Sequence, residues 1–358
     1  MSPVTGRIVC SDTQRAARLA TVTLVAVEQL SQNGGGGFGR RVMAHTDLDG
    51  NFSVQAEPGD YYALATAVGY VSTVAGLSAR LDSGATAADL LSRIPQVHVA
   101  EGSGGSVNLT LDRGAAVAGK LVWDDGTPAA GVNVNALSTT ASFTPGARVG
   151  SDLARVTAQL GGMAGGFQIS DDRGVFRITG LAPGAYYVRA TVMTPSAEPN
   201  FAGYGQRMDG ISLYAPGKVR RGDAQTVTLK LAEERDDLVF TLNLGALHTV
   251  SGHATSADGS GNVASGMVRL TDSQDSTLNR QAQIQPDGSF MLQWVPAGSY
   301  TLTVMGASAI PNTQSGRRGQ TISDSGSRYQ RFQESLTVAD SDLSGVNLSL
   351  VRATGQRD

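Results

Sequence analysis

The residues in this chain best suited to metal chemistry are one histidine–glutamate pair. His98 and Glu101 have the His-x-x-Glu spacing of a zinc-binding pair. Residues three apart on a strand face opposite sides of a sheet, and Val97 and Val99 are expected to face the core. His98 therefore faces solvent in this interpretation, and no downstream histidine has a context that supports a third ligand. The sequence favours an exposed strand histidine over a zinc site.

A second group of candidate ligands is a set of aspartates in turns. Asp47 and Asp49 alternate as in a calcium loop, but no bidentate glutamate follows at the distance that such a loop requires. Similar turns contain Asp171-Asp172 and Asp287, and aspartate side chains commonly cap turns. The sequence therefore favours turns. Asp47 and Asp49 remain the weak calcium candidates, and no cofactor is expected.

Nothing in the sequence indicates a catalytic set. The chain has no Gly-x-Ser-x-Gly elbow and no Walker motif, and its glycine run from residue 34 to residue 39 lacks the Lys-Ser/Thr that follows a phosphate loop. We therefore expect no enzymatic activity. Exposed aromatic rings could instead stack on sugars, and the candidates are Trp123, Phe201 and Tyr204. For Trp123, partial burial at a strand end is an equally good interpretation.

Composition and charge narrow the class of protein. The chain has 358 residues, a hydrophobic share of 41%, a charged share of 16% and a formal net charge of −3. These values fit a lightly charged chain with buried cores, and the absence of lysine or arginine runs argues against nucleic acid as a partner. No apolar stretch reaches the ~18 residues of a membrane helix. Cys10 is the single cysteine, so no intrachain disulfide can form.

One sequence motif occurs three times along the chain. Its copies define the strands and turns that position the candidate residues. Each copy has a Gly-x-Phe turn and strand, a Pro/Gly turn, and a second strand that begins near a tyrosine. The repeated residues are the glycines Gly50, Gly174 and Gly288, the phenylalanines Phe52, Phe176 and Phe290, and the tyrosines Tyr61 or Tyr62, Tyr186 or Tyr187, and Tyr300. We interpret the phenylalanines and tyrosines as core anchors. The third copy has Pro296-Ala297-Gly298 in place of Pro-Gly, which predicts an extra residue in its turn.

The repeat predicts an all-β chain of three tandem Greek-key β-sandwiches, each of roughly 100 residues plus loops. The expected domains are residues 1–113, residues 114–244 with a loop insertion at 138–166, and residues 245–358 with a polar insertion at 307–330. One short helix is expected over residues 83–95, capped by Ser83 and stopped by Pro95. Because linkers are nearly absent, we expect a stiff rod.

The first strand of each expected domain and the repeated motif that follows it together resemble the carboxypeptidase regulatory-like domain. The pattern is Val-x-Gly near Val4, Val117 and Val250, then Gly-x-Phe, then Pro-Gly-x-Tyr. That family groups with transthyretin-like and collagen-adhesin B-type β-sandwiches of secreted bacterial proteins. The resemblance implies a seven- or eight-strand sandwich that is extracytoplasmic and without catalytic activity. It implies a location outside the cell or on its surface, with any leader removed or absent from this sequence.

These observations favour a non-catalytic structural or interaction protein of the cell surface, such as a self-assembling fibre subunit or adhesion protein. Edge strands of sheets can pair between subunits, and the expected contact residues are Val4, Gly6 and Ile8, with the 138–166 arm as a second contact. Partners would be further copies of the chain, other surface proteins or glycans, with no membrane span. The alternative is a carbohydrate-binding accessory protein.

Overall fold

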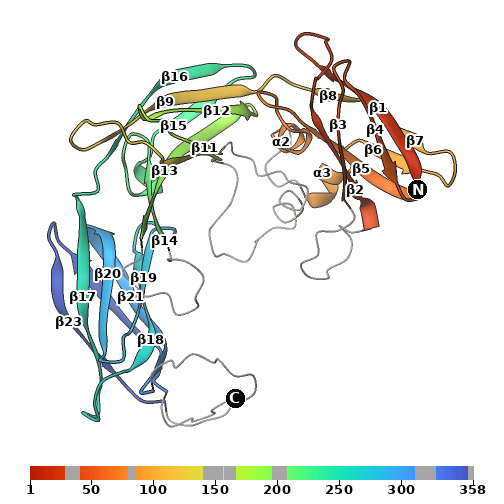
Figure 1. Cartoon of the computed structure of the whole chain (residues 1–358). Helices are drawn as coiled ribbons and strands as arrows, with labels where there is room; N and C mark the ends of the chain where they lie inside the picture. The colour runs from red at the N-terminus through yellow and green to blue at the C-terminus, as the bar shows by residue number, and fades with distance from the viewer. Residues whose placement is uncertain are drawn as a thin grey trace. The chain divides into compact units, whose positions relative to one another are not determined.

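The fold is given by a computed structural model, which describes residues 1–28, 41–79, 86–139, 156, 167–195, 208–310 and 328–353. Strands dominate these residues, and the expected all-β chain of tandem sandwiches is confirmed (Figure 1). Among the described residues, no helix has the length and apolar character that crossing a membrane requires. The chain divides into two compact units. One unit contains Met1–Leu121, Pro128–Ala190 and Gln225–Phe240, and the other contains Val122–Thr127, Thr191–Ala224 and Thr241–Asp358.

The N-terminal sandwich, called sandwich 1, consists of two sheets. The first sheet contains β4 (Asn51–Ala56), β1 (Ser2–Cys10), β7 (Gly105–Ser106) and β8 (Leu109–Leu111). The second has the order β3 (Arg41–His45), β2 (Thr21–Ala26), β5 (Gly59–Thr66) and β6 (Gln96–Val99). Alternating side chains from both sheets fill one core, in which Val4, Leu24, Phe52 and Tyr61 are almost wholly buried.

Sandwich 2 repeats this arrangement. Its first sheet has the order β12 (Val175–Leu181), β9 (Ala115–Trp123) and β16 (Glu234–Leu242). Its second sheet contains β11 (Phe167–Ile169), β10 (Asn133–Ser138), β13 (Gly184–Pro195), β14 (Met208–Tyr214) and β15 (Thr226–Leu229), and a 3₁₀ turn at Arg221–Asp223 lies before β15. In the core, the Phe176 and Phe240 rings meet edge-on with their centroids 6.2 Å apart.

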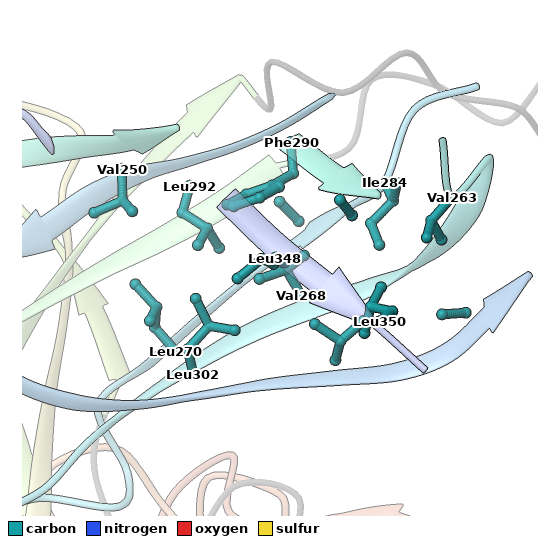
Figure 2. Close-up of a cluster of buried hydrophobic side chains, with 14 of the residues drawn as sticks. Val250, Val263, Val268, Leu270, Ile284, Phe290, Leu292, Leu302, Leu348 and Leu350 are labelled. Atoms are coloured by element: carbon teal, nitrogen blue, oxygen red, sulfur yellow. The ribbon is translucent and has the colours of Figure 1, made fainter. Parts of the chain in front are cut away.

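Sandwich 3 repeats the arrangement again. Its first sheet has the order β20 (Ser289–Pro296), β17 (Leu247–Ser256) and β23 (Leu343–Leu350). The second sheet has the order β19 (Asn279–Gln283), β18 (Ser265–Asp272), β21 (Gly298–Ser308) and β22 (Phe332–Val338). Figure 2 shows the core between the two sheets, where Phe290, Leu292 and Leu348 point toward one another. The expected domain boundaries would lie between β8 and β9 and between β16 and β17, whereas the two compact units are divided at other places, so the division into three domains stays a prediction.

The first strand of each sandwich lies in the interior of its sheet. In sandwich 1, β1 pairs antiparallel with β4 on one side and parallel with β7 and β8 on the other. In sandwich 3, β17 likewise lies between antiparallel β20 and parallel β23. A parallel partner comes from the far end of the domain sequence, so this position could not be inferred from local patterns. The chain ends of each domain are thereby held in the same sheet.

The helices differ from the expectation. The expected helix over residues 83–95 is shorter, since α3 covers Ala87–Leu91 and Thr86 caps it through a capping box with Asp89. Ser83, the expected cap, lies outside the described residues. A second helix, α2 (Thr73–Ser78), was not expected, because β-branched residues and a glycine give its six residues low helix propensity. Tertiary packing stabilises α2, since Val74 is buried.

Both helices cover the outer face of the second sheet of sandwich 1. A small apolar cluster forms there from strand and helix side chains, including Tyr62, Leu64, Val74 and Leu90. Val156, from the insertion of sandwich 2, is 2% exposed and joins the same cluster. The rest of the 138–166 insertion beyond Thr139 lies outside the described residues. The described part of this arm therefore packs against sandwich 1 of its own chain.

The insertion expected at residues 307–330 begins later than its sequence suggests. Ala307 and Ser308 still belong to β21, and Ala307 is buried in the core. At the other end, Tyr329 is 8% exposed and forms an isolated bridge with Arg352. Residues 311–327 lie outside the described residues.

Candidate functional site

The repeated phenylalanines and tyrosines are packing residues in all three sandwiches. Phe52, Phe176 and Phe290 are at most 4% exposed, which agrees with their interpretation as core anchors. Each repeated tyrosine donates its hydroxyl to the backbone carbonyl four residues before it. The pairs are Tyr61 with Glu57 at 3.0 Å, Tyr186 with Ala182 at 2.7 Å and Tyr300 with Pro296 at 2.7 Å. Burial raises the pKa of Tyr186 and of Tyr300 to about 12, so both hydroxyls stay protonated as donors.

Removing one of these tyrosine hydroxyls should lower the free energy of unfolding by a measurable amount. Tyr300→Phe leaves the buried Pro296 carbonyl without its donor, and we expect the free energy of unfolding of sandwich 3 to fall by about 1–2 kcal/mol. Urea unfolding of the full chain, followed by hydrogen exchange in β17 and β21, measures this change. An unchanged free energy of unfolding would show that water replaces the hydroxyl at no cost.

The Pro/Gly turn in the third copy of the motif has the same form as the turns in the other two copies. The expectation of an extra turn residue is therefore wrong. The glycines that end the turns have similar φ values of 146°, 154° and 156°, at Gly59, Gly184 and Gly298. The additional residue lies in the preceding strand, as a bulge. Trp294 takes φ 60° there, and the β17–β20 register shifts between His248 and Val250. Sandwich 2 places Gly180, with φ 76°, in the corresponding bulge.

The candidate calcium ligands form a turn. The Asp47 carboxylate accepts the backbone N–H groups of Asp49 at 2.9 Å and Asn51 at 2.8 Å. Asp171 accepts from Arg173 and Val175 in the same way, at 3.0 Å and 2.7 Å. Asp49 is exposed, and the described residues contain no group of three metal-binding side chains. The geometry supports the turn, and calcium binding at Asp47 and Asp49 stays a prediction without a structural argument.

These turn aspartates should make the stability depend on acid pH. Backbone hydrogen bonds lower the pKa of Asp47 and of Asp171 in the folded chain, led by those from Asn51 and Val175. A lowered folded pKa gives stability that is present above the unfolded pKa of about 4 and is lost as the pH falls through the folded pKa. We expect the thermal midpoint of the native chain to fall between pH 4 and pH 2.

The matched variant for this pH prediction is Asp47→Asn with Asp171→Asn. Its amides still accept the backbone N–H groups but do not titrate, so its midpoint should fall less over the same pH range. Calorimetric scans of both proteins from pH 5 to pH 2 measure the difference. Parallel curves for the two proteins would contradict the role of these carboxylates.

His98 lies on the solvent face of β6, as expected, since Val97 and Val99 on either side are buried. Its Nδ1 lies 2.7 Å from Oδ1 of Asp60, and the two side chains are 70% and 60% exposed. Glu101 is exposed in the turn that follows β6. The structure therefore pairs His98 with Asp60 on the neighbouring strand and does not bring Glu101 into a zinc site.

Of the three candidate stacking aromatics, the structure describes Trp123 alone. Trp123 ends β9 and is half-buried, which matches the alternative of partial burial. Phe201 and Tyr204 lie outside the described residues. The structure thus supplies no support for sugar binding through this set.

The expected subunit contact at the N-terminal strand needs correction. Val4 and Ile8 are fully buried in the core of sandwich 1, and Gly6 pairs with Phe52 on β4. Because β1 has partners on both sides, it offers no free edge to another subunit. Deleting residues 1–9 would remove an inner strand of sandwich 1, so loss of assembly in that variant could not be assigned to a contact.

Direct packing holds sandwich 1 to sandwich 2 where the chain passes between them. Gly114 donates its backbone N–H to the carbonyl of Gly69 at 2.9 Å, and the Arg113 guanidinium lies over the Tyr70 ring at 5.4 Å. The bulge residue Gly180 lies so close that a Cβ atom there would be 2.8 Å from the Tyr70 carbonyl oxygen. We call this contact joint 1.

A buried ion pair holds the segment after β14 to sandwich 3. Arg220 donates from Nε at 2.9 Å and from a terminal nitrogen at 2.7 Å to Oδ2 of Asp272. It also donates to the carbonyl of Ala297 at 2.9 Å, and the backbone N–H of Arg221 donates to Asp275 at 2.8 Å. The Asp272 carboxylate raises the Arg220 pKa. We call this contact joint 2.

A cavity of about 310 Å³ opens on sandwich 1 beside α2. Its size is at the lower limit of ligand pockets. Apolar and polar side chains both line it, among them Val71, Leu77, Leu109, Arg93, Asn108 and Asp112. Asn108 already accepts the backbone N–H of Arg7 at 2.9 Å. The lining contains no arrangement of nucleophile and base that would suggest a reaction.

Comparison with known proteins gives no family. No known family profile matches the chain, and no curated protein matches it. A streptococcal ancillary pilin is 12% identical over 98% of this chain and 99% of that chain, with a TM-score of 0.27. The minor pilin GBS52 of Streptococcus agalactiae is 13% identical over 68% of this chain and 98% of that chain, with a TM-score of 0.30.

A third similar structure is the TIE protein of Bacillus anthracis, at 12% identity and a TM-score of 0.22. The alignment covers 98% of this chain and about half, 51%, of that chain. TM-scores this low support no inference about function. The resemblance to the carboxypeptidase regulatory-like domain stays an expectation from the sequence.

Proposed function

We propose that this chain is a non-catalytic extracellular structural subunit that associates with further copies of itself through the edge strands of its sheets. The observation that carries the proposal is the position of its exposed apolar side chains. Three edge strands carry such side chains, at 52–61% exposure: Met43 on β3, Val239 on β16 and Met291 on β20. An extracellular location rests on the sequence resemblance.

Edge strands with apolar side chains favour association. An edge presents unpaired backbone N–H and C=O groups, and soluble proteins usually protect it with charge, proline or a covering segment. A strand from a second subunit can satisfy those groups, and apolar side chains on the edge add burial to the backbone hydrogen bonds. The edges of β3, β16 and β20 therefore replace β1 as the proposed contacts.

Joint 1 and joint 2 each limit motion inside one of the two compact units. Joint 1 lies in the first unit and joint 2 in the second, and both are direct contacts in which backbone groups, a ring and a buried ion pair are already satisfied. A unit with little internal motion loses less conformational entropy when it joins an assembly.

Charged substitutions on the edges test the proposal. We expect the native chain to form assemblies with rising concentration in light scattering, and Met43→Lys and Val239→Lys to reduce or abolish them. Val68→Lys is the matched control, because Val68 is 95% exposed and lies in a loop. A native chain that stays monomeric at all concentrations, or edge variants that assemble as it does, would contradict the proposed function.

A further inference from the structure

The outer face of the second sheet of sandwich 2 combines an aromatic ring, an amide and a guanidinium. Side chains on β10 and β13 alternate between the core and this face. Asn135 and Arg189 are half-buried on the outer face, while their neighbours Val134 and Val188 are buried in the core. Phe167, on edge strand β11, is 60% exposed.

Strand register places these three side chains in one row. Phe167 on β11 lies opposite Asn135 on β10. The backbone N–H of Thr139 donates to the carbonyl of Ala185 at 2.9 Å, and this antiparallel register, continued along β10 and β13, places Asn135 opposite Arg189. Sandwich 1 keeps the same pairing without a shift over β2 and β5. Neighbouring strands are about 4.8 Å apart, so the row from ring to guanidinium spans roughly 10 Å.

Arg189 lacks a counter-charge in this row. Its Nε is buried without a hydrogen-bond acceptor, and within the described part of the chain it forms no ion pair. Among the outward side chains that the structure describes on this five-stranded sheet, none is a carboxylate. An unpaired, partly buried cation is costly to keep, and an anionic ligand would offset that cost.

The equivalent face of sandwich 1 is built differently. There, Tyr62 and Leu64 take the places of Tyr187 and Arg189, and α2 and α3 cover them in an apolar cluster. The charged and aromatic row therefore serves no packing role that the repeated fold requires.

We propose that the row Phe167–Asn135–Arg189 binds an acidic glycan. A sugar ring stacks on the exposed Phe167 ring, and the Asn135 amide hydrogen-bonds ring hydroxyls. The two terminal nitrogens of the Arg189 guanidinium bind the carboxylate of a uronic acid. This site goes beyond the structural role and does not depend on assembly. It uses none of Trp123, Phe201 and Tyr204.

Calorimetric titration of the full chain with a galacturonate oligosaccharide tests the site, with its methyl ester as the matched neutral probe. The native chain should bind the acid saturably and the ester at least tenfold more weakly. Arg189→Gln should weaken binding of the acid at least tenfold, and Phe167→Ala about threefold or more. Arg173→Gln is the control and should bind as the native chain does, since Arg173 lies in an exposed turn.

Several results would overturn the proposal. They are the absence of saturable binding, equal binding of acid and ester, unchanged binding by Arg189→Gln, or equal competition by an acidic peptide such as oligoglutamate. If a thermal scan shows that Arg189→Gln does not fold, the Phe167→Ala variant at an exposed position and the comparison of acid with ester still test whether the row binds the glycan. Light scattering on the same samples reports assembly separately, so failure of the glycan site and failure of the proposed function can be distinguished.

Discussion

Replacing Asp272 by alanine is expected to lower the free energy of unfolding of sandwich 3 by about 3–5 kcal/mol. The Asp272 side chain is 1% exposed, and both of its oxygens are used. Oδ2 accepts two hydrogen bonds from Arg220, and Oδ1 accepts the backbone N–H groups of Gln274 and Asp275, each at 2.9 Å. The substitution removes these acceptors and leaves the Arg220 guanidinium, itself 18% exposed, without its counter-charge.

Urea unfolding followed by Trp294 fluorescence, in a Trp123→Phe background, measures this change because Trp294 lies in sandwich 3. Arg220→Met combined with Asp272→Ala should recover part of the loss, since it removes the unpaired cation as well. The matched control is Glu334→Ala on β22 of the same sandwich. The Glu334 side chain is exposed, so only a small change in the free energy of unfolding is expected. A loss of that small size in Asp272→Ala would contradict the importance of joint 2.

Replacing Phe290 by alanine is expected to cost about 3–5 kcal/mol of the same free energy. Phe290 is 3% exposed and lies between the two sheets of sandwich 3, against Leu292 and Leu348 (Figure 2). The glycine opposite it, Gly252, leaves room for the ring, because a Cβ atom there would be 2.9 Å from the ring carbon Cζ. Alanine therefore leaves a cavity that the paired strands cannot easily close.

The control for this substitution is Met291→Ala on the same strand. Met291 is 52% exposed, so we expect a change within about 0.5 kcal/mol. Both variants are measured by the same urea titration. Equal effects of the two substitutions would contradict the position of Phe290 in the core.

The core anchors were predictable from the sequence, whereas strand positions in the sheets were not. Phe52, Phe176 and Phe290 follow a turn glycine by two residues, and this local pattern alone indicates which side chain turns inward. Ile8, by contrast, was expected at a free edge, because its partner Leu109 comes from a hundred residues later in the sequence. Local alternation indicates the buried side of a strand, but not its neighbours.

The interaction residues depend on distant parts of the sequence as well. Arg220 and Asp272 are 52 residues apart, and no motif connects them. Phe167, Asn135 and Arg189 come together only through the pairing of three strands. Short α2 was missed for a related reason, since burial of Val74 rather than helix propensity stabilises it.

The central claim is that direct contacts, and not flexible linkers, join the repeated sandwiches. Its most direct test is a spin-label distance measurement between sandwich 1 and sandwich 2, which joint 1 connects within one compact unit, with cysteines placed at the exposed positions Asp49 and Asp172 and with the buried Cys10 replaced by alanine. We predict a single narrow distance distribution that broadens in Arg113→Ala. A broad distribution in the native chain, unchanged by that substitution, would contradict the claim.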